Sequence, residues 1–390
     1  MMAQQSEIYL IEAEAALKQN DTSRAISYFQ SILDFDQTYF PAALRLSEIF
    51  YEKKSWGQSA LYANIALDLL KETEKKITHI DYTQLKKDTL VSLKDYHDYQ
   101  KLKADIASVL HLRAKSRMRQ QNYYSAVTDL DSAFAYAPLN TGILIDLGIA
   151  NLETGDIPDA LSNFFLALDI DPNNYTAHYN IGLLYLQTRD SSDAVQYLEK
   201  SIQLNDSLTS AMIELARVYM EWEKYEKAII IYTNILAIND HNIEARFRRG
   251  FAYNKTEHYE AAIQDWDSTY HTDSSQVEAI RNAGLTRMQI KDYEGAIRNF
   301  TTYIKRLPGY TVGYLNRGYA FLLQNEYKKA IKDFETMIEL DPEEDNGYYY
   351  LSMTYAFHGK KKKACNAFNK ALEKGYNFDN ADEIIKKICQ

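Results

Sequence analysis

One spacing constrains this chain more than any other feature: alanine recurs every 34 residues, eight times in succession. The alanines are Ala126, Ala160, Ala194, Ala228, Ala262, Ala296, Ala330 and Ala364. Twelve residues before each of them stands another small residue, namely Ala114, Gly148, Gly182, Ala216, Gly250, Gly284, Gly318 or Ser352. A fixed period of this length is typical of a solenoid, in which each repeat buries its apolar face by stacking on its neighbours. We therefore expect one continuous repeat architecture.

Each repeat has the pattern of two helices. In 141–174 the apolar residues recur three and four positions apart, which is helical periodicity. The turn-forming pair Gly155-Asp156 separates two apolar runs, and Asp171-Pro172 ends the second, because proline cannot continue a helix. Small residues on the first helix let the second approach to the near end of the usual range of roughly 8 to 10 Å. The sequence predicts an all-α fold of antiparallel helix pairs.

The order of residues within each repeat resembles the tetratricopeptide repeat. A small residue is followed by an aromatic residue, then by alanine, a second aromatic residue and proline, at that family's spacing. The resemblance covers eight contiguous repeats in 107–378 and two weaker copies in 6–73, where Ser47 and Ser59 replace the expected Gly and Ala. It implies a right-handed superhelical solenoid of about ten repeats, closed by a capping helix at 379–390. It also implies a scaffold that holds another protein or peptide on its concave surface.

The stretch 74–106 breaks the register between the two groups of repeats. Neither glycine nor proline occurs from Gln58 to Ala137, so we expect helix. Its apolar content is too high for an unfolded linker, with Ile77, Ile80, Leu85, Leu90, Leu93, Tyr96 and Leu102 at loose helical spacing. Two interpretations are open: a degenerate extra repeat, or lengthening of the flanking helices into a projecting hairpin.

Arginine and aspartate occupy one pair of places, sixteen residues apart, in three repeats. The pairs are Arg113 with Asp129, Arg249 with Asp265, and Arg317 with Asp333. Three other repeats hold Leu147 and Asn163, Ile181 and Tyr197, or Leu215 and Ile231 at the same places. The two charges therefore appear together or not at all, and we predict salt bridges between the helices of one repeat. A structural role is favoured over ligand binding, because paired charges usually satisfy each other.

Helical spacing places a further set of side chains on the concave surface formed by the first helices. The candidate partner-binding residues are Tyr179, Leu183, Arg217, Phe247, Arg248, Phe251, Arg281 and Tyr319. Aromatic and arginine side chains are common at binding anchors, since they bury much area with few rotatable bonds and arginine adds directional donors. The alternative is that about half of these side chains pack between adjacent first helices.

The partner suggested by these residues is an acidic stretch of protein, because Arg246, Arg248, Arg281 and Arg287 add positive charge. Capture of chaperone tails is not expected. The family members that do so place a lysine where this chain has Ile145, Tyr179, Ile213 or Phe247.

No catalytic constellation is apparent. The eight histidines include no pair four residues apart, and the glycines follow the repeat period instead of clustering into a phosphate-binding loop. A net charge of −10 argues against a general nucleic-acid binder. No apolar run approaches the roughly 20 residues needed to cross a bilayer. We expect no enzyme activity, no cofactor, no metal, no nucleic acid and no direct membrane span.

The C-terminal run from Lys363 to Cys389 resembles the cap of exported tetratricopeptide repeat proteins from Bacteroidota. Such caps commonly carry a bridge, which implies a disulfide between Cys365 and Cys389; the other interpretation is two buried free thiols. The first five residues, Met-Met-Ala-Gln-Gln, resemble the end of a secretory signal from such a bacterium. These resemblances favour a periplasmic location, with a cytoplasmic location as the alternative.

Two functions follow from these features. The leading hypothesis is a non-enzymatic scaffold that holds a partner protein, in a cell-envelope or outer-membrane complex. The alternative is a peptide-responsive regulator whose superhelix changes pitch when a ligand binds. An enzyme with an accessory repeat region is disfavoured, because only 74–106 lies outside the repeats and this is too short for a catalytic domain.

Overall fold

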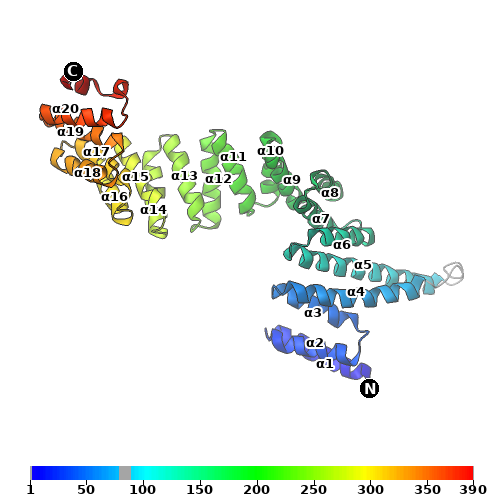
Figure 1. The fold of residues 1–390 in the computed structure, drawn as a ribbon. Coiled ribbons are helices and arrows are strands. Elements are labelled where there is room, and N and C mark those ends of the chain that lie inside the picture. The colour runs from blue at the N-terminus through cyan, green and yellow to red at the C-terminus, as the bar shows by residue number, and fades with distance from the viewer. Residues whose placement is uncertain (1, 79–88, 390) are drawn as a thin grey trace. The chain divides into compact units, whose positions relative to one another are not determined.

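The computed structural model describes residues 2–78 and 89–389 of the chain. Within these ranges the regular structure is entirely helical, without strands (Figure 1). The chain divides into two compact units, Met1–Asp206 (unit 1) and Ser207–Gln390 (unit 2). Each unit is an all-α solenoid in which consecutive helix pairs stack.

Unit 1 contains five helix pairs. They are α1 (Met2–Lys18) with α2 (Thr22–Phe35), α3 (Phe40–Glu52) with α4 (Trp56–Thr78), α5 (Thr89–Arg119) with α6 (Tyr123–Tyr136), α7 (Thr141–Thr154) with α8 (Ile157–Ile170), and α9 (Tyr175–Gln187) with α10 (Ser191–Leu204). Each helix contacts the next along the chain, so the apolar core runs along the stack. Phe29, Leu130 and Phe164 are among its fully buried side chains.

Unit 2 contains five more pairs and a terminal segment. The pairs are α11 (Thr209–Glu221) with α12 (Tyr225–Ile238), α13 (Ile243–Lys255) with α14 (Tyr259–Thr272), α15 (Val277–Gln289) with α16 (Tyr293–Arg306), α17 (Thr311–Leu323) with α18 (Tyr327–Leu340), and α19 (Asp345–Phe357) with α20 (Lys361–Glu373). A short 3-10 helix (Phe378–Asn380) and α21 (Glu383–Cys389) follow. The rings of Trp266, Phe300 and Phe334 occupy the core of successive pairs.

The small residues of the repeat mark the contact between the two helices of a pair. A Cβ atom at Gly148 would lie 2.4 Å from the ring of Phe164, and one at Gly284 would lie 2.6 Å from the ring of Phe300. Both distances are far below a carbon–carbon contact, so a larger residue would force the helices apart. The eight alanines of the ladder on the second helices are fully buried. The 34-residue period therefore reflects a steric requirement repeated in every pair.

The turn between the helices of a pair has the same backbone conformation in all ten repeats. The fifteenth residue of each repeat is left-handed, with φ values from 57° to 86°. Only Gly155 and Gly359 are glycines there; the others are Asn20, Lys54, Gln121, Arg189, Glu223, Glu257, Lys291 and Asn325. An L-residue in this region costs roughly 1–2 kcal/mol. The turns are thus held in place by packing of the helices on either side.

The described parts of the stretch 74–106, residues 74–78 and 89–106, belong to two lengthened helices. Helix α4 has 23 residues and α5 has 31, whereas the first helix of most later repeats has 13. The two helices pack against each other (Figure 1), and Tyr136 of α6 donates a 2.9 Å hydrogen bond to Glu74 of α4. Buried Leu102 and Ile106 join the core of unit 1. The structure thus has lengthened flanking helices at this point; Ile80 and Leu85 of the apolar pattern lie outside the described residues.

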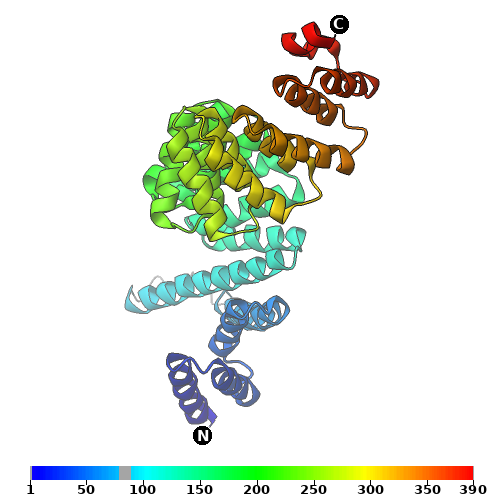
Figure 2. The same cartoon turned by 90° about the vertical axis from the view of Figure 1, so that its left-hand side faces the viewer.

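The last repeat is covered by α21 and joined to it covalently. Cys365 of α20 and Cys389 of α21 form a disulfide, with their Cα atoms 5.1 Å apart. Ile385 of α21 is buried in a cluster with Phe368 of α20 and Tyr349 of α19, and Figure 2 shows α21, in red, beside α20. The capping helix therefore begins at Glu383 and not at 379, because Phe378–Asn380 form the 3-10 helix that precedes it.

Candidate functional site: the inner face of the first helices

Several first helices of consecutive repeats lie close to one another within each unit. Contacts join α3 to α5, α5 to α7 and α7 to α9 in unit 1, and α15 to α17 and α17 to α19 in unit 2. Among the described residues, consecutive second helices make no contacts of this extent. The surface of the first helices is therefore the crowded side of each stack. We call it the inner face.

Three exposed apolar side chains follow one another on the inner face of unit 2. Phe251 of α13, Leu285 of α15 and Tyr319 of α17 stand at the ninth place of their repeats, 34 residues apart. They are 39 %, 37 % and 39 % exposed. Large apolar side chains are normally buried in the core, whereas these three are partly exposed at the same place of three consecutive repeats. We call these three residues the inner stripe.

Ring contacts fix the orientation of two members of the inner stripe. The ring of Phe251 lies edge-on to Phe247, at 5.3 Å between centroids, and edge-on to buried Trp266, at 5.5 Å. Trp266 is itself held by a 3.1 Å hydrogen bond from its indole Nε1 to the carbonyl oxygen of Phe247. The ring of Tyr319 packs edge-on against Tyr350, at 5.8 Å. These anchors are pre-ordered, which reduces the entropy lost when a partner binds.

The inner-face arginines of unit 2 already have acidic partners. Arg217 pairs with Glu214 at 3.0 Å and with Glu221 at 2.7 Å. Arg281 pairs with Glu278 at 2.6 Å, and Arg248 with Glu244. Each pair lies on one helix, three or four residues apart, which is the spacing at which helical side chains meet. In the chain by itself these arginines are paired at the surface, and the hypothesis of an acidic partner stays a prediction.

The two remaining arginines of that hypothesis serve the fold. Arg287 is largely buried and bonds Asp267 of α14 at 2.7 Å and Asn299 of α16 at 3.0 Å. Arg246 donates to the carbonyl oxygen of Asp240 and to the hydroxyl of Thr272. These contacts were not predicted, because helical position alone does not reveal which carboxylate or carbonyl accepts from each guanidinium.

Unit 1 presents a different inner face. Tyr179 and Leu183 of α9, both expected to bind a partner, are half-buried there. A hollow of about 320 Å³ opens nearer the N-terminus, with Tyr51, Lys115 and Ile149 among its lining residues. The Lys115 ammonium lies 5.5 Å from the ring centroid of Tyr51. Sequence reasoning missed this hollow, although Lys115 and Ile149 stand at the same ninth place as the inner stripe.

The three arginine–aspartate pairs are bidentate ion pairs between the helices of one repeat. The shorter contact of each is 2.5 Å for Arg113–Asp129, 2.8 Å for Arg249–Asp265 and 2.7 Å for Arg317–Asp333. The aspartates are buried. Hydrogen bonding to Asp265 raises the pKa of Arg249, against the opposing effect of desolvation. Paired and hydrogen-bonded in this way, the buried charges stabilise the interface and are not available to a ligand.

Each of these arginines also reaches the preceding repeat. Arg249 donates from Nη1 to the hydroxyl of Thr233 at 3.1 Å, and Arg317 donates in the same way to Thr301 at 3.2 Å. Both threonines stand sixteen residues before their arginine. The guanidinium therefore joins two repeats as well as two helices. The regular spacing of threonine, arginine and aspartate is a signal in the sequence for this contact between repeats.

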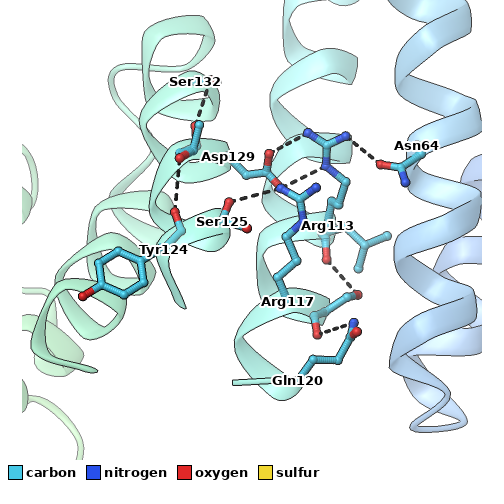
Figure 3. Close-up of polar contacts among 11 residues, drawn as sticks. Asn64, Arg113, Arg117, Gln120, Tyr124, Ser125, Asp129 and Ser132 are labelled. Carbon is cyan, nitrogen blue, oxygen red and sulfur yellow. Dashed lines mark hydrogen bonds and ion pairs between the residues drawn. The ribbon is translucent and has the colours of Figure 1, made fainter. Parts of the chain in front are cut away.

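In the described part of unit 1, Arg113 has no partner sixteen residues before it, because the stretch 74–106 is inserted between its repeat and the preceding one. Arg113 donates from Nη1 to the side-chain oxygen of Asn64 in α4, at 2.7 Å. A second arginine, Arg117, reaches Asp129 at 2.6 Å, so one buried carboxylate accepts from two guanidinium groups (Figure 3). Burial lowers the pKa of Arg117, although Asp129 opposes the shift.

Comparison with protein families agrees with the repeat geometry. Models described as "Tetratricopeptide repeat" match residues 111–175, 175–207, 209–242 and 312–344. These parts of the chain are tetratricopeptide repeats. That family consists of generally non-enzymatic interaction folds, and this repeat protein shares their architecture of stacked helix pairs. No curated protein sequence matches the chain.

Several solved structures are similar to parts of this repeat protein. A tetratricopeptide repeat protein from Parabacteroides merdae is 22 % identical over 64 % of this chain and 97 % of its own, with a TM-score of 0.40. MamA from Desulfovibrio magneticus is 19 % identical over 43 % of this chain and 94 % of its own, with a TM-score of 0.40. YrrB, a repeat protein with an unusual peptide-binding site, is 17 % identical over 49 % and 96 %, with a TM-score of 0.42.

Two further findings concern the described part of the chain. It contains no group of three or more histidine, cysteine, aspartate or glutamate side chains that could hold a metal ion. None of its helices is long and apolar enough to cross a membrane.

Proposed function

We propose that this repeat protein is a non-enzymatic scaffold that holds an extended segment of a partner protein along the inner stripe. The observation that carries the proposal is the regular exposure of Phe251, Leu285 and Tyr319 on three consecutive first helices. Exposed apolar side chains in a row, with paired charges beside them, are characteristic of a protein-binding surface.

The spacing of the inner stripe supports an extended partner. Packed helices lie roughly 8 to 10 Å apart. A segment in the polyproline II conformation rises about 3.1 Å per residue and has three residues per turn, so three residues span the same distance and every third side chain lies on one face. Apolar side chains at every third residue of such a segment would meet successive members of the inner stripe. The ion pairs of Arg217 and Arg281 lie beside that path and are accessible enough to exchange partners.

Site-specific photo-crosslinking tests this proposal in cells that make the protein. A photoreactive phenylalanine analogue replaces Phe251, Leu285 or Tyr319 in turn, and exposed Ile230 and Leu340 of second helices serve as matched apolar controls. We expect one adduct of the same mass at all three inner positions and none at the controls. Adducts at the controls alone, or at no position, would contradict the proposal.

Binding should also depend on the apolar character of the stripe. Changing Phe251, Leu285 and Tyr319 together to serine is expected to weaken the captured partner's affinity about a hundredfold or more, because hot-spot side chains each contribute on the order of 2 kcal/mol. Ile230→Ser should leave the affinity within about twofold. Titration with the crosslinked partner, once identified, supplies the measurement.

We further propose that the scaffold works in an oxidising compartment of the cell envelope, such as the periplasm. The bond between Cys365 and Cys389 supports this location, because disulfides persist in such compartments and are rare in a reducing cytoplasm. Alkylation of thiols in intact cells tests it: we expect no labelling before reduction and two labelled cysteines after it. Full labelling without a reductant would favour the cytoplasmic alternative.

A further inference from the structure

The turns within the repeats of unit 2 differ sharply in charge. Because the helices of a pair are antiparallel and stack in order, these turns follow one another along one edge. In the five repeats of unit 2, the turn and the residues on either side of it occupy the same seven places, namely 221–227, 255–261, 289–295, 323–329 and 357–363. In each of the first three, acidic residues outnumber lysines by one, whereas 323–329 has two lysines and one acid, and 357–363 has four lysines and no acid. Positive charge therefore gathers at the last two turns of a chain whose net charge is −10.

Few acidic side chains lie beside these lysines in the described structure, although Lys363 lines a hollow of about 430 Å³ with Glu335 and Glu339. Of the lysines in the last two turns, Lys329 alone makes an ion pair within the described residues, with Glu326. The lysines from Lys360 to Lys363 are exposed at the start of α20, whose first turn contains no acid. The Lys363 ammonium lies 5.5 Å from the ring centroid of Tyr355, a contact that leaves its charge in place. The cluster is a concentrated, solvent-facing source of positive potential.

Two exposed apolar side chains border the same turns. Leu323 ends α17 and is 39 % exposed, and Phe357 ends α19 and is 45 % exposed. They stand at the same place of successive repeats. The rings of Tyr327 and His358 join the two turns, at 5.2 Å between centroids. A hollow of about 490 Å³, lined by Asn325, Lys328 and His358 among others, lies between them. The two turns thus form one surface, which we call the basic edge.

We propose that the basic edge docks unit 2 on an anionic membrane surface. Lysine side chains are flexible point charges without the fixed fork that recognises one carboxylate or phosphate, so they suit a diffuse field of anionic headgroups. Leucine and phenylalanine at the tips of the turns can enter the boundary between headgroups and acyl chains, as in other interfacial proteins. The two turns carry no arginine, and the exposed Leu323 and Phe357 suit the boundary of the acyl chains, which favours a lipid surface over nucleic acid.

The disulfide contributes to the basic edge. It fixes the last turn of α21, which carries exposed Lys387, against α20 five residues after the lysine run begins. The covalent cap thus adds charge to the surface and holds the last repeat in the shape that displays it. This inference does not depend on the inner stripe, because its charges lie in the turns, although Leu323 of the basic edge shares α17 with Tyr319.

Vesicle flotation of the full chain tests the proposal. We expect the protein to float with vesicles of phosphatidylcholine containing about one third phosphatidylglycerol, and not with phosphatidylcholine alone. Raising the salt to about 0.5 M should release it, because screening shortens the reach of the lysine charges. Failure of the wild-type chain to bind the anionic vesicles would overturn the proposal.

Two charge-matched variants locate the binding surface. The first changes Lys360, Lys361, Lys362 and Lys363 to glutamine, and we expect vesicle affinity to fall tenfold or more, since each lysine near an anionic surface contributes to binding. The second changes exposed Lys18, Lys53, Lys54 and Lys255 to glutamine and should stay within about twofold of wild type. Equal loss in both variants would mean that net charge and not this edge is responsible, which would reject the inference.

A third variant tests the two apolar side chains of the basic edge. Leu323→Ser with Phe357→Ser keeps the charge and should lower vesicle affinity about fivefold or more, with a stronger salt dependence of the remaining binding. Circular dichroism of every variant checks that the helices are retained. If the lysine variant loses an acidic protein partner while the wild type ignores vesicles, the edge binds protein and the membrane proposal is wrong. Photo-crosslinking from Leu285 in the lysine variant keeps this result separate from the scaffold function.

Discussion

Repeats 209–242 and 243–276 are neighbours with the same backbone, yet they join their two helices in different ways. The first places Leu215 and Ile231 at the facing positions, and the second places Arg249 and Asp265 there. The charged pair is bidentate and its carboxylate is buried. The interface between the two helices of a repeat can therefore hold an apolar pair or a charged pair, provided that both members of the pair are present. Half of a charged pair would leave a buried charge without a partner.

The charged repeat also carries a contact between repeats that the apolar one lacks. Arg249 uses its remaining nitrogen on Thr233, which belongs to the preceding repeat. The apolar pair has no polar atom to extend in this way. The charged pair therefore also helps to orient the preceding repeat, whereas the apolar pair stabilises only by burying its own side chains.

The largest effect is expected from breaking the charged pair. Asp265→Ala leaves the guanidinium of Arg249 buried without its carboxylate, which costs about 3–5 kcal/mol. Urea unfolding of unit 2, followed by circular dichroism, measures the loss. A loss below about 1 kcal/mol would mean that water reaches Arg249 easily and that the pair is dispensable.

Converting one kind of repeat into the other should have a smaller effect. Arg249→Leu combined with Asp265→Ile copies the residues of the neighbouring repeat, and we expect the free energy of unfolding to stay within about 1.5 kcal/mol of wild type. The same urea titration applies. If the double variant is as unstable as Asp265→Ala, the two repeats differ in backbone geometry and the comparison fails.

The link between repeats is expected to contribute about 1 kcal/mol, the value of an ordinary hydrogen bond. Thr233→Val removes the hydroxyl that accepts from Arg249 and keeps the shape of the side chain. Combining it with the Leu–Ile double variant provides the control, because no arginine is then present to lose a partner. An equal loss in both backgrounds would show that Thr233 acts through packing and not through the arginine.

The smallest effect concerns the turn, which the two kinds of repeat share. Glu223 in the apolar repeat and Glu257 in the charged repeat both have left-handed φ, at 57° and 62°. Glycine at either position relieves the left-handed strain but loses more entropy on folding, for a net gain of about 0.5 kcal/mol. The two gains, measured from thermal midpoints, should agree within about 0.3 kcal/mol. Unequal gains would show that the pair between the helices, charged or apolar, affects the stability of the turn.

The arginines show why some of the candidate site was predictable and some was not. Arg249 and Asp265 vary together between repeats, so their contact is visible in the sequence. Arg281 and Glu278 are paired as closely, but three-residue spacing between opposite charges is so common on helices that it carries no signal. Exposure at the ninth place was equally hidden: Leu183 is half-buried and Leu285 more exposed, although both are leucines at one position.

The sequence by itself determined the helix pairs, their order and the residues crowded between them, because in a repeat array these contacts join positions close along the chain and recur in each copy. Only the tertiary structure decided the rest. It assigned 74–78 to α4 and 89–106 to α5, gave the arginines of the inner face their acidic partners, and placed the lysines of two turns on one edge. The physical reason is that exposure and partner choice depend on side chains brought together from several helices, and no single period records them.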